Sequence, residues 1–286
     1  MTRKLVVEFT KMEGAGNDFV VLDNRFLHFS SEELSDIAAR VCPRRFGIGA
    51  DGLLAFEMAD DADFRMRYVN ADGSPATMCG NGARCLARFA VTAGVQGPNV
   101  SFLTDAGTYR AYVPTDPDAA VRIYVPEPER WTPNIALEAD PPGGMEAVHF
   151  IWTGTEHLVV PVDDAAAAPL ETWGPHLRCD AALQPEGANV NLVAIGEDPR
   201  SISIRTYEKG VEGETLACGT GVLAAAVATS RLRGSAAGLA SEPVTVKTRG
   251  GRLRVGRAET PERPDHLYLE GPARSVFRGT FEWDST

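Results

Sequence analysis

The chain of 286 residues is 44% hydrophobic and 23% charged, a composition typical of a globular protein with a substantial core. Its length exceeds what one hydrophobic core usually holds, so we expect two domains. The net charge of −11, with acids spread through turns, disfavours nucleic acid or an anionic membrane surface as a partner.

The N-terminal residues, MTRKLVVEFTKMEG, turn polar too soon for a signal peptide, and the sequence has no run of about 18 apolar residues. The five cysteines are an odd number, and none lies in a C-x-x-C pair. These features favour a cytoplasmic protein that keeps its cysteines as thiols over a disulfide framework.

The first elements in chain order are two apolar runs, residues 5–9 and 19–23, on either side of a Gly-rich turn. This pattern predicts strand, loop, strand, and residues 150–164 repeat it. Ser30 and the acids after it predict a capped helix that runs to Val41, and residues 169–177 give a weaker helix signal. Alternating residues predict strands at 64–68 and 202–207.

Each of these later strands leads to a Gly-bearing loop, a cysteine and an Ala-rich helical run that a glycine ends. We therefore expect a mixed α/β (α+β) fold of two halves, each mostly β with one central helix. The expected halves are residues 1–125, joined by a final strand at 274–286, and residues 126–273. The Pro-rich segment 125–134 is the expected linker.

The two helical runs belong to a repeated device. YVNADGSPATMCGNGARC begins at Tyr68 and YEKGVEGETLACGTGVLA begins at Tyr207, and the tyrosine and the cysteine keep the same spacing in both copies. Cys79 and Cys218 each precede a helix, whose N-terminal N–H groups and dipole stabilise a thiolate. Two such acid/base groups suit a reaction in which a proton leaves one face of a carbon and returns on the other.

Free cysteine is commonly a small buried hydrophobe, and we assign that role to Cys42, Cys85 and Cys179. The five histidines show no metal-ligand spacing, so we expect no metal site.

At these residues the sequence resembles the diaminopimelate epimerase family, whose members work without pyridoxal phosphate. The resemblance covers almost the whole chain. It rests on KMEGAGNDFVVLDNR (11–25), RRFGIGADGLL (44–54), NADGSPATMCGNGARC (70–85), EGANVNLV (186–193) and GETLACGTG (213–221). It implies two pseudo-symmetric domains, an active site in the interdomain cleft, an amino-acid substrate and no cofactor.

The resemblance also implies residue roles. Cys79 and Cys218 match the catalytic thiolate base and thiol acid, which exchange roles with substrate configuration. The remaining matches are to substrate-binding asparagines (Asn17, Asn70, Asn189), to backbone groups that hold the reacting carboxylate (Gly80, Asn81, Gly219, Thr220), to an acid at the amino end (Glu208) and to a histidine near the thiols (His157). Without the resemblance, His157 would be taken for a satisfied surface histidine, and the three asparagines could equally be turn-forming amides.

Two departures from the family pattern concern the end of the substrate far from the reacting carbon. The usual Glu-Arg-Gly is here Glu208-Lys209-Gly210, and a lysine keeps the charge but loses the bidentate fork. The usual Gly-Asn-Pro-His is here Gly154-Thr155-Glu156-His157, so Thr155 replaces an amide.

These observations lead to a cofactor-independent epimerase of LL-2,6-diaminoheptanedioate as the first hypothesis, with a homodimer as a candidate assembly. A racemase of another amino acid is the second, because of Lys209 and Thr155. Proline racemase-like enzymes normally read Cys-Gly-His at the first motif, and Asn81 disfavours them. A redox protein that joins Cys79 to Cys218 is a third hypothesis from a different class, and a non-catalytic amino-acid-binding protein is weaker still.

Overall fold

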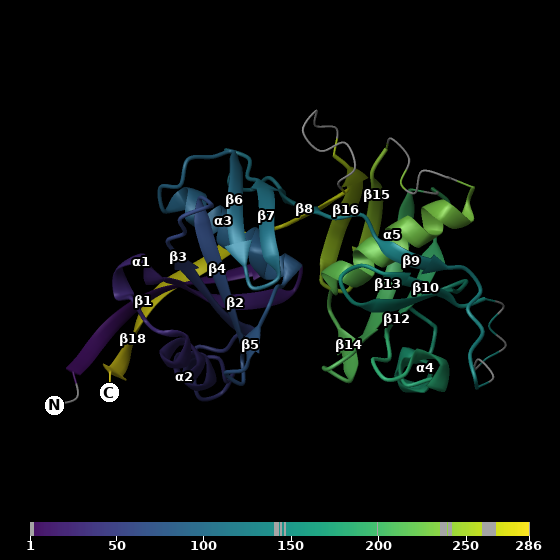
Figure 1. The fold of residues 1–286 in the computed structure, drawn as a ribbon, viewed down its shortest axis with the longest axis horizontal. Coiled ribbons are helices and arrows are strands. Elements are labelled where there is room, and N and C mark those ends of the chain that lie inside the picture. The colour runs from purple at the N-terminus through teal and green to yellow at the C-terminus, as the bar shows by residue number, and fades with distance from the viewer. Residues whose placement is uncertain are drawn as a thin grey trace. The chain divides into compact units, whose positions relative to one another are not determined.

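The computed structural model describes residues 3–139, 143, 145, 147–198, 200–234, 239, 242–258 and 267–285. The chain forms two compact units. One combines Met1–Ile123 with Gly271–Thr286, and the other is Tyr124–Glu270. Each unit consists of strands arranged about one long helix (Figure 1).

In the first unit, β1 (Arg3–Gly14) and β2 (Asn17–Asp23) form an antiparallel hairpin. The expected Gly-rich turn is confirmed, and its two residues, Ala15 and Gly16, have φ of 54° and 92°. The other strands of this unit are β3 (Gly52–Glu57), β4 (Phe64–Asn70), β5 (Pro75–Ala76), β6 (Asn99–Thr104), β7 (Gly107–Tyr112), β8 (Val121–Val125, in which the unit ends) and β18 (Arg274–Ser285).

Three helices complete the first unit: α1 (Asn24–Leu27), α2 (Ser31–Val41) and α3 (Gly80–Thr92). The capping signal at Ser30 is confirmed, because Ser30 Oγ accepts from Glu33 N while the Glu33 carboxylate accepts from Ser30 N. The apolar face of α2 then packs in a core with residues of β2 and β3.

The second unit repeats the strand pairing of the first. From β1 to β7 the pairs β1–β2, β2–β3, β3–β4, β4–β6 and β6–β7 are antiparallel, parallel, antiparallel, parallel and antiparallel. The pairs β10–β11, β11–β12, β12–β13, β13–β15 and β15–β16 follow the same order. The strands from β9 onward have these bounds: β9 (Glu129–Thr132), β10 (His149–Trp152), β11 (Glu156–Pro161), β12 (Asn189–Ile195), β13 (Ser201–Glu208), β14 (Gly213–Thr215), β15 (Val244–Thr248), β16 (Gly251–Arg257) and β17 (Leu267–Gly271).

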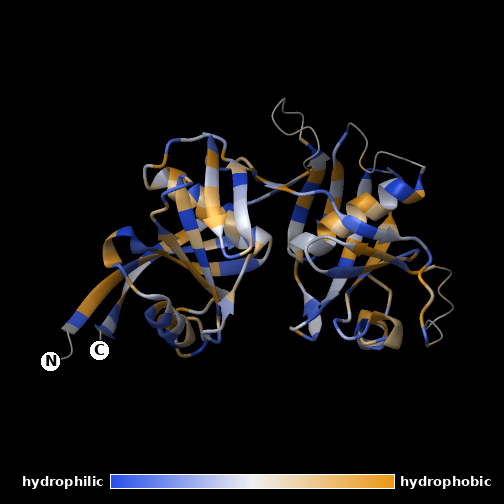
Figure 2. Ribbon diagram, viewed as in Figure 1, coloured by the Kyte–Doolittle hydropathy of each residue, from blue (hydrophilic) through white to orange (hydrophobic). Residues whose placement is uncertain are grey.

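The helices of the second unit are α4 (Leu170–Arg178), a 3₁₀ turn at Ala181–Leu183 and α5 (Gly219–Leu232). The helix expected at 169–177 is therefore confirmed. α3 and α5 are the buried helices of their units, and each contacts several strands. Figure 2 shows the mostly apolar colouring of α5 among strands of mixed colour. Gly94 and Gly234, with φ of 103° and 83°, follow these helices at the expected places.

The segment expected to be a linker, 125–134, is partly regular structure. β8 ends at Val125, and β9 forms a ladder with β10 in which Phe150 pairs with Thr132. The prediction of a linker throughout this segment is therefore wrong. A four-residue strand has too little periodicity to be seen in sequence, and the prolines on either side of it disfavour a strand.

Candidate active site

Cys79 lies where α3 begins. It is the N-cap residue, with φ of −139° and ψ of 120°, and its Sγ accepts a hydrogen bond from Gly82 N at 3.5 Å. Its carbonyl accepts from Ala83 N at 2.7 Å, the first bond of the helix. The first N–H groups of a helix have no intrahelical acceptor, so negative charge on this half-buried sulfur is stabilised there.

Cys218 occupies the same position at α5. It is the N-cap residue, it is 8% exposed, and its Sγ lies 3.3 Å from Thr220 Oγ1. Thr153 Oγ1 donates to Thr220 O at 3.1 Å, which ties the start of α5 to the end of β10. The two copies of the sequence device therefore adopt the same local structure.

Close packing fixes the start of α5 on the sheet. A Cβ added at Gly221 would lie 2.4 Å from Asn191 Oδ1, so another residue fits there only if the hydrogen-bonded Asn191 side chain shifts. At the corresponding Gly82 of α3 the contact would be 3.1 Å, to Leu54 Cδ2. The second glycine of each Cys-Gly-x-Gly core thus lets the cysteine-bearing turn approach the strands.

A buried polar chain joins two of the predicted substrate-binding residues in the first unit. Asn81 Nδ2 donates to Asn17 Oδ1 at 2.5 Å, and Arg84 Nη2 donates to Asn81 Oδ1 at 2.6 Å. Asn17 Nδ2 in turn donates to Asp51 Oδ2 at 2.9 Å. Arg84 is 0% exposed, and burial lowers its pKa. The Gly-rich turn is thereby fixed to the first turn of α3.

Ion pairs hold the same Gly-rich turn from the other side. Asp18 accepts from Lys11 and Arg44 at 2.7 Å each, and Arg44 also contacts Asp51 at 2.6 Å. Burial alone would raise the pKa of Asp18, but the hydrogen bonds from Arg44 and Lys11 lower it. Asn17 is therefore presented by a rigid loop.

Asn70 lies apart from this network. Its Nδ2 donates to Ser74 Oγ at 3.0 Å, and its backbone N–H donates to Ser74 O, so Asn70 closes the turn after β4. The turn-forming reading of this amide holds here, and its substrate-binding role stays a prediction.

In the second unit Asn189 bridges the two loops that depart from the family pattern. Its Nδ2 donates to Glu156 O at 3.0 Å, and its Oδ1 accepts from Lys209 N at 2.8 Å. Lys209 Nζ forms an ion pair with Glu156 Oε2 at 2.7 Å, and Thr155 Oγ1 lies 3.3 Å from the same oxygen. The two loops that depart from the family pattern are thus in direct contact with each other, through Glu156 and Lys209.

His157 is fully buried, so the alternative reading of a surface histidine is wrong, while its place near the thiols stays a prediction. Asn191 holds its ring: Asn191 Oδ1 accepts from Thr206 Oγ1, which turns the amide nitrogen toward Leu158 O and His157 Nδ1. Nδ1 is then the acceptor, and the proton of the neutral ring sits on Nε2. Burial, reinforced by the charge of Lys209, lowers the pKa of His157 to about 3. Nε2 has no hydrogen-bond partner in the part of the chain that the structure describes.

Glu208, beside Lys209 in sequence, is partly buried at the end of β13. Burial raises the pKa of its carboxyl group above the ordinary value. A carboxyl group in such a place keeps its proton to a higher pH than one in water.

The remaining cysteines differ from one another. Cys42 and Cys85 are buried as expected, and burial raises the pKa of each thiol to about 12. Cys179 is exposed, so its assignment as a buried hydrophobe is wrong. It follows the last residue of α4, past the stripe of that helix that Leu170 and Leu177 bury.

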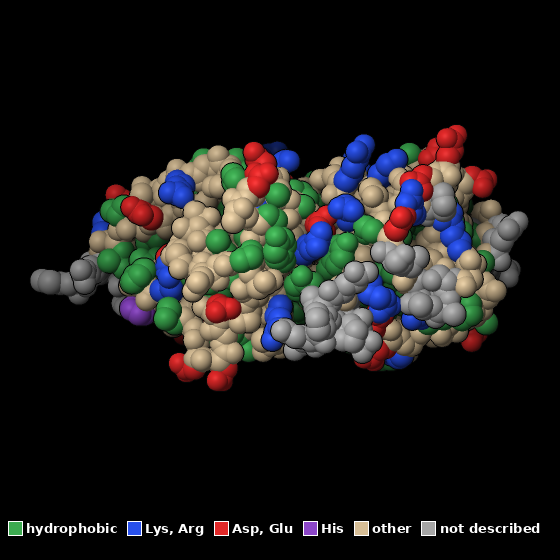
Figure 3. Space-filling model, turned by 90° about the horizontal axis from the view of Figure 1, so that it is seen from above, with side chains coloured by type: hydrophobic (Ala, Val, Ile, Leu, Met, Phe, Trp, Pro, Cys, Tyr) green, Lys and Arg blue, Asp and Glu red, His purple; other side chains and the backbone are tan. Residues whose placement is uncertain are grey.

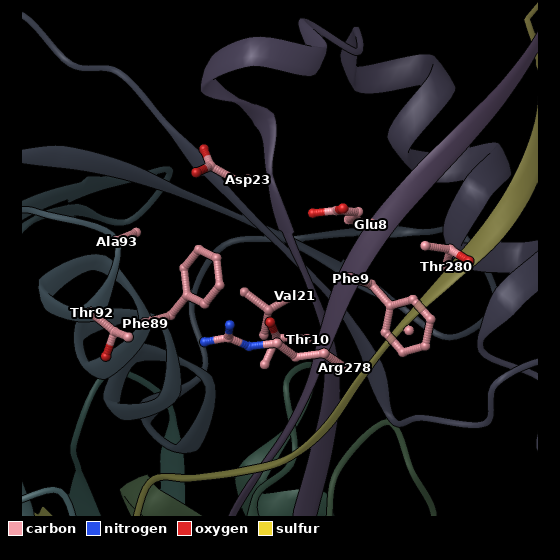
Figure 4. Close-up of a pocket in the computed structure, with 11 residues that line it drawn as sticks. Glu8, Phe9, Thr10, Val21, Asp23, Phe89, Thr92, Ala93, Arg278 and Thr280 are labelled. Carbon is pink, nitrogen blue, oxygen red and sulfur yellow. The ribbon is translucent and has the colours of Figure 1, made fainter.

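Other features lie away from the predicted residues. A cavity of about 600 Å³ in the first unit is lined by residues such as Phe9, Phe89 and Arg278 (Figure 4). None of the predicted site residues lines this cavity. Within the described ranges no group of three His, Cys, Asp or Glu could hold a metal ion, and no helix is long and apolar enough to cross a membrane. Acidic and basic side chains are interspersed on the face shown in Figure 3.

Comparison with known sequences gives the family. The sequence profile of diaminopimelate epimerase matches residues 9–130 and 149–276. The chain belongs to the diaminopimelate epimerase family. The diaminopimelate epimerase of Chlorobaculum tepidum is 42% identical over 274 residues, covering 94% of this chain and 99% of that protein. That of Aquifex aeolicus is 39% identical over 283 residues, covering 96% and 97%.

Solved structures of low sequence identity show the same fold. A phenazine biosynthesis protein of the PhzF family from Bacillus anthracis superposes with a TM-score of 0.73 at 15% identity, covering 97% of this chain and 99% of the other. A hydroxyproline epimerase from Agrobacterium vitis gives 0.68 at 15% identity, covering 100% and 95%. The expected fold class, mixed α/β with mostly strands, is confirmed.

Four polar residues that hold predicted site residues in place were not themselves predicted, although they lie in the recognised motifs. Arg84 and Asn191 hold Asn81 and His157, and Arg44 and Asp51 hold the loop of Asn17. Their motifs were recognised, but the contacts of Asn191 and Arg44 join segments that are distant in sequence, and that of Arg84 lies within α3.

Proposed function

We propose that this epimerase interconverts LL-2,6-diaminoheptanedioate and the meso isomer by moving the proton at one Cα, without a cofactor. The observation that carries the proposal is the repeated cysteine at the start of a buried helix, in a chain of this family. One thiolate removes the α-proton and the other thiol delivers a proton to the opposite face. The roles of Cys79 and Cys218 exchange in the reverse direction.

The carboxylate at the reacting carbon is held by backbone N–H groups of Gly80, Asn81, Gly219 and Thr220. This assignment is supported by their place in the first turns of α3 and α5, where N–H groups have no intrahelical acceptor. As the α-proton leaves, charge moves onto that carboxylate, and preorganised donors stabilise it.

The other predicted residues surround these groups in the proposal. Asn17, Asn70 and Asn189 bind the substrate, Glu208 contacts an amino group, and neutral His157 lies near a reacting thiol. The rigid hydrogen bonds of Asn17 and Asn189 support a preorganised site. The free cysteines support a cytoplasmic location, and a homodimer stays a prediction that light scattering on the purified protein can test.

The decisive experiment follows deuterium entry at Cα and product stereochemistry in heavy water. Cys79→Ser and Cys218→Ser each replace a thiol by a far weaker acid, so we expect epimerisation to fall by at least about a hundredfold, the scale of a lost acid/base group. Cys179→Ser makes the same change at an exposed cysteine and is the matched control. Undiminished epimerisation in either active-site variant contradicts the two-thiol mechanism.

A racemase of another amino acid is the second candidate, because Lys209 replaces the usual arginine and its charge is paired with Glu156. A panel of amino acids assayed beside the LL and meso isomers separates the two. Faster turnover of a monocarboxylic amino acid would replace the first proposal by this one.

A further inference from the structure

Arg84 is a fully buried cation whose hydrogen bonds all go to neutral groups. Its side chain is 0% exposed. Its Nη2 donates to Asn81 Oδ1 at 2.6 Å, its Nη1 to Gly80 O at 3.4 Å and its Nε to Pro272 O at 3.3 Å. Within the described ranges it forms no ion pair with a carboxylate. A buried charge without a counter-charge is costly, so an anion close to this guanidinium is strongly stabilised.

The guanidinium of Arg84 lies beside the first turn of α3. Arg84 itself belongs to the second turn, but its side chain reaches back to Gly80 and Asn81, the two residues that follow Cys79. Cys79 Sγ accepts the hydrogen bond from Gly82 N at this same turn. The positive charge is therefore held next to the cysteine that caps the helix.

Three groups can supply the missing negative charge. Burial lowers the pKa of Arg84, and the charges that act in the opposite direction are those of Cys85, Cys79 and Glu13. Cys85 is a neutral thiol at ordinary pH, because burial raises its pKa to about 12. Glu13 of β1 is 30% exposed and pairs with Arg274 at 3.5 Å. Cys79 is the remaining group.

Other acids on the strands that α3 contacts have cations of their own. These pairs are Asp18 with Lys11 and Arg44, Asp51 with Arg44, Asp23 with Arg25, and Glu57 with Arg65 and Arg67. Glu8 of β1 is exposed to solvent. The fold thus leaves the Cys79 thiolate as the natural counter-charge of Arg84.

The second copy of the cysteine device has no such cation. Arg84 comes five residues after Cys79, and the residue five positions after Cys218 is Leu223. Leu223 is 4% exposed, and α5 has no charged residue before Arg231 near its end. The two helix starts have the same backbone form, so this side chain is a point at which the two thiols differ in their electrostatic surroundings.

We propose that Arg84 is a positioning residue that keeps Cys79 as the thiolate of the resting enzyme, while Cys218 rests as the thiol. This inference rests on the proposed two-thiol mechanism. Cys79 then removes the α-proton, and the Cys218 thiol gives its proton to the opposite face of the carbon. The enzyme is left with a Cys79 thiol and a Cys218 thiolate. It returns to rest when Cys218 takes a proton from water and Cys79 releases one to water.

The test measures the pH at which each cysteine becomes reactive. Iodoacetamide alkylates the thiolate and not the thiol, so the alkylation rate of each cysteine-bearing peptide, followed by mass spectrometry against pH, gives a midpoint. Exposure scales the rate at every pH and leaves the midpoint in place. In the wild type we expect a lower midpoint for Cys79 than for Cys218.

Arg84→Met removes the charge and keeps a side chain of similar length. We expect it to raise the Cys79 midpoint by at least about one pH unit, the scale of an opposite charge close by, and not to raise that of Cys218. Arg84→Lys restores the charge and should return the Cys79 midpoint most of the way to the wild-type value. A purely structural role of Arg84 would give neither the selectivity for Cys79 nor this rescue.

Arg88→Met is the matched control on the same helix. Arg88 lies one turn further along α3, about 6 Å along its axis, and is 8% exposed. Its guanidinium donates to the carbonyls of Pro114 and Ala119, away from the first turn. This variant removes the same charge from the same helix, and the Cys79 midpoint should stay where it is.

The outcomes separate this inference from the proposed function. A wild-type Cys79 midpoint at or above that of Cys218 overturns the inference without any variant, so the test stands even where Arg84→Met does not fold. A Cys79 midpoint that Arg84→Met leaves unchanged, or that Arg88→Met raises equally, also overturns it. If the wild type epimerises neither the LL nor the meso isomer, the proposed function fails, and the midpoints still decide whether Arg84 holds a Cys79 thiolate.

Discussion

His157 is a base that the fold keeps neutral. Asn191 fixes the ring through Nδ1, and complete burial together with the charge of Lys209 disfavours the imidazolium form. A positive charge at His157 would also oppose Lys209 and Arg130, the two cations that pair with Glu156. The residue therefore offers one N–H at a fixed place and takes no proton at ordinary pH.

This neutrality predicts a pH dependence of stability. The unfolded chain binds a proton at His157 below about pH 6.5, whereas the folded protein does not until about pH 3. The contribution to stability is therefore complete above pH 6.5 and is lost as the pH falls from 6.5 toward 3, by about 1.4 kcal/mol per pH unit.

The measurement is the free energy of unfolding in urea at pH 7 and pH 5. The wild type should lose about 2 kcal/mol more between these values than His157→Asn, which has no titrating ring. His28→Asn, at an exposed histidine, is the control and should match the wild type. Parallel pH profiles for the wild type and His157→Asn would contradict the assignment.

At the scale of elements, the two cysteine helices depend on close contact with the strands beneath them. Gly221 places the first turn of α5 against Asn191 and Thr206 of the neighbouring strands, and Gly82 does the same for α3. Each helix N-terminus is thus fixed with respect to the strands whose loops bear the predicted binding residues of its own unit.

Gly221→Ala should therefore destabilise the protein and lower activity. The added Cβ would lie 2.4 Å from Asn191 Oδ1, and overpacking of this kind costs about 1–3 kcal/mol. Gly213→Ala, where a Cβ meets nothing within 4 Å, is the matched control. Urea midpoints measure the difference, and equal midpoints for the two variants would show that the turn has room.

Much of the secondary structure could be predicted from the sequence. The strand–turn–strand pattern at 5–23, the capped helix ending at Val41 and the helix after Cys79 have strong local signals of alternation, capping and small residues. The edge strand β9 lacks such a signal. The contact of Glu156 with Lys209 was also not predictable, because these residues are 53 positions apart and their pairing is set by strand register rather than by nearby sequence.

For the whole molecule, the last strand completes the first unit. β18 pairs with β1 along most of its length, from Arg3 opposite Ser285 to Glu13 opposite Arg274. Trp283 is 8% exposed in the core that also contains Val7 and residues of α2. The first unit can therefore close its core only after residues 274–285 have been made.

Trp283→Ala should consequently cost about 3–5 kcal/mol, the usual range for a large aromatic residue removed from a core. Phe277→Ala, on the same strand but 47% exposed, should cost clearly less. Thermal unfolding followed by calorimetry compares the two variants with the wild type. A loss for Phe277→Ala as large as that for Trp283→Ala would mean that strand pairing, rather than burial, is what β18 contributes.

The contact between Glu156 and Lys209 has a consequence for engineering. The two positions share a salt bridge, and Asn189 joins their backbones, so neither can be exchanged independently. Lys209→Arg alone would drive a longer, planar group into the space that Glu156 fills. Replacing Glu156 alone would leave Lys209 and Arg130, the two cations that pair with it, without their shared anion. Residues 155, 156 and 209 therefore form one cassette, and a transplant between relatives should move all three together.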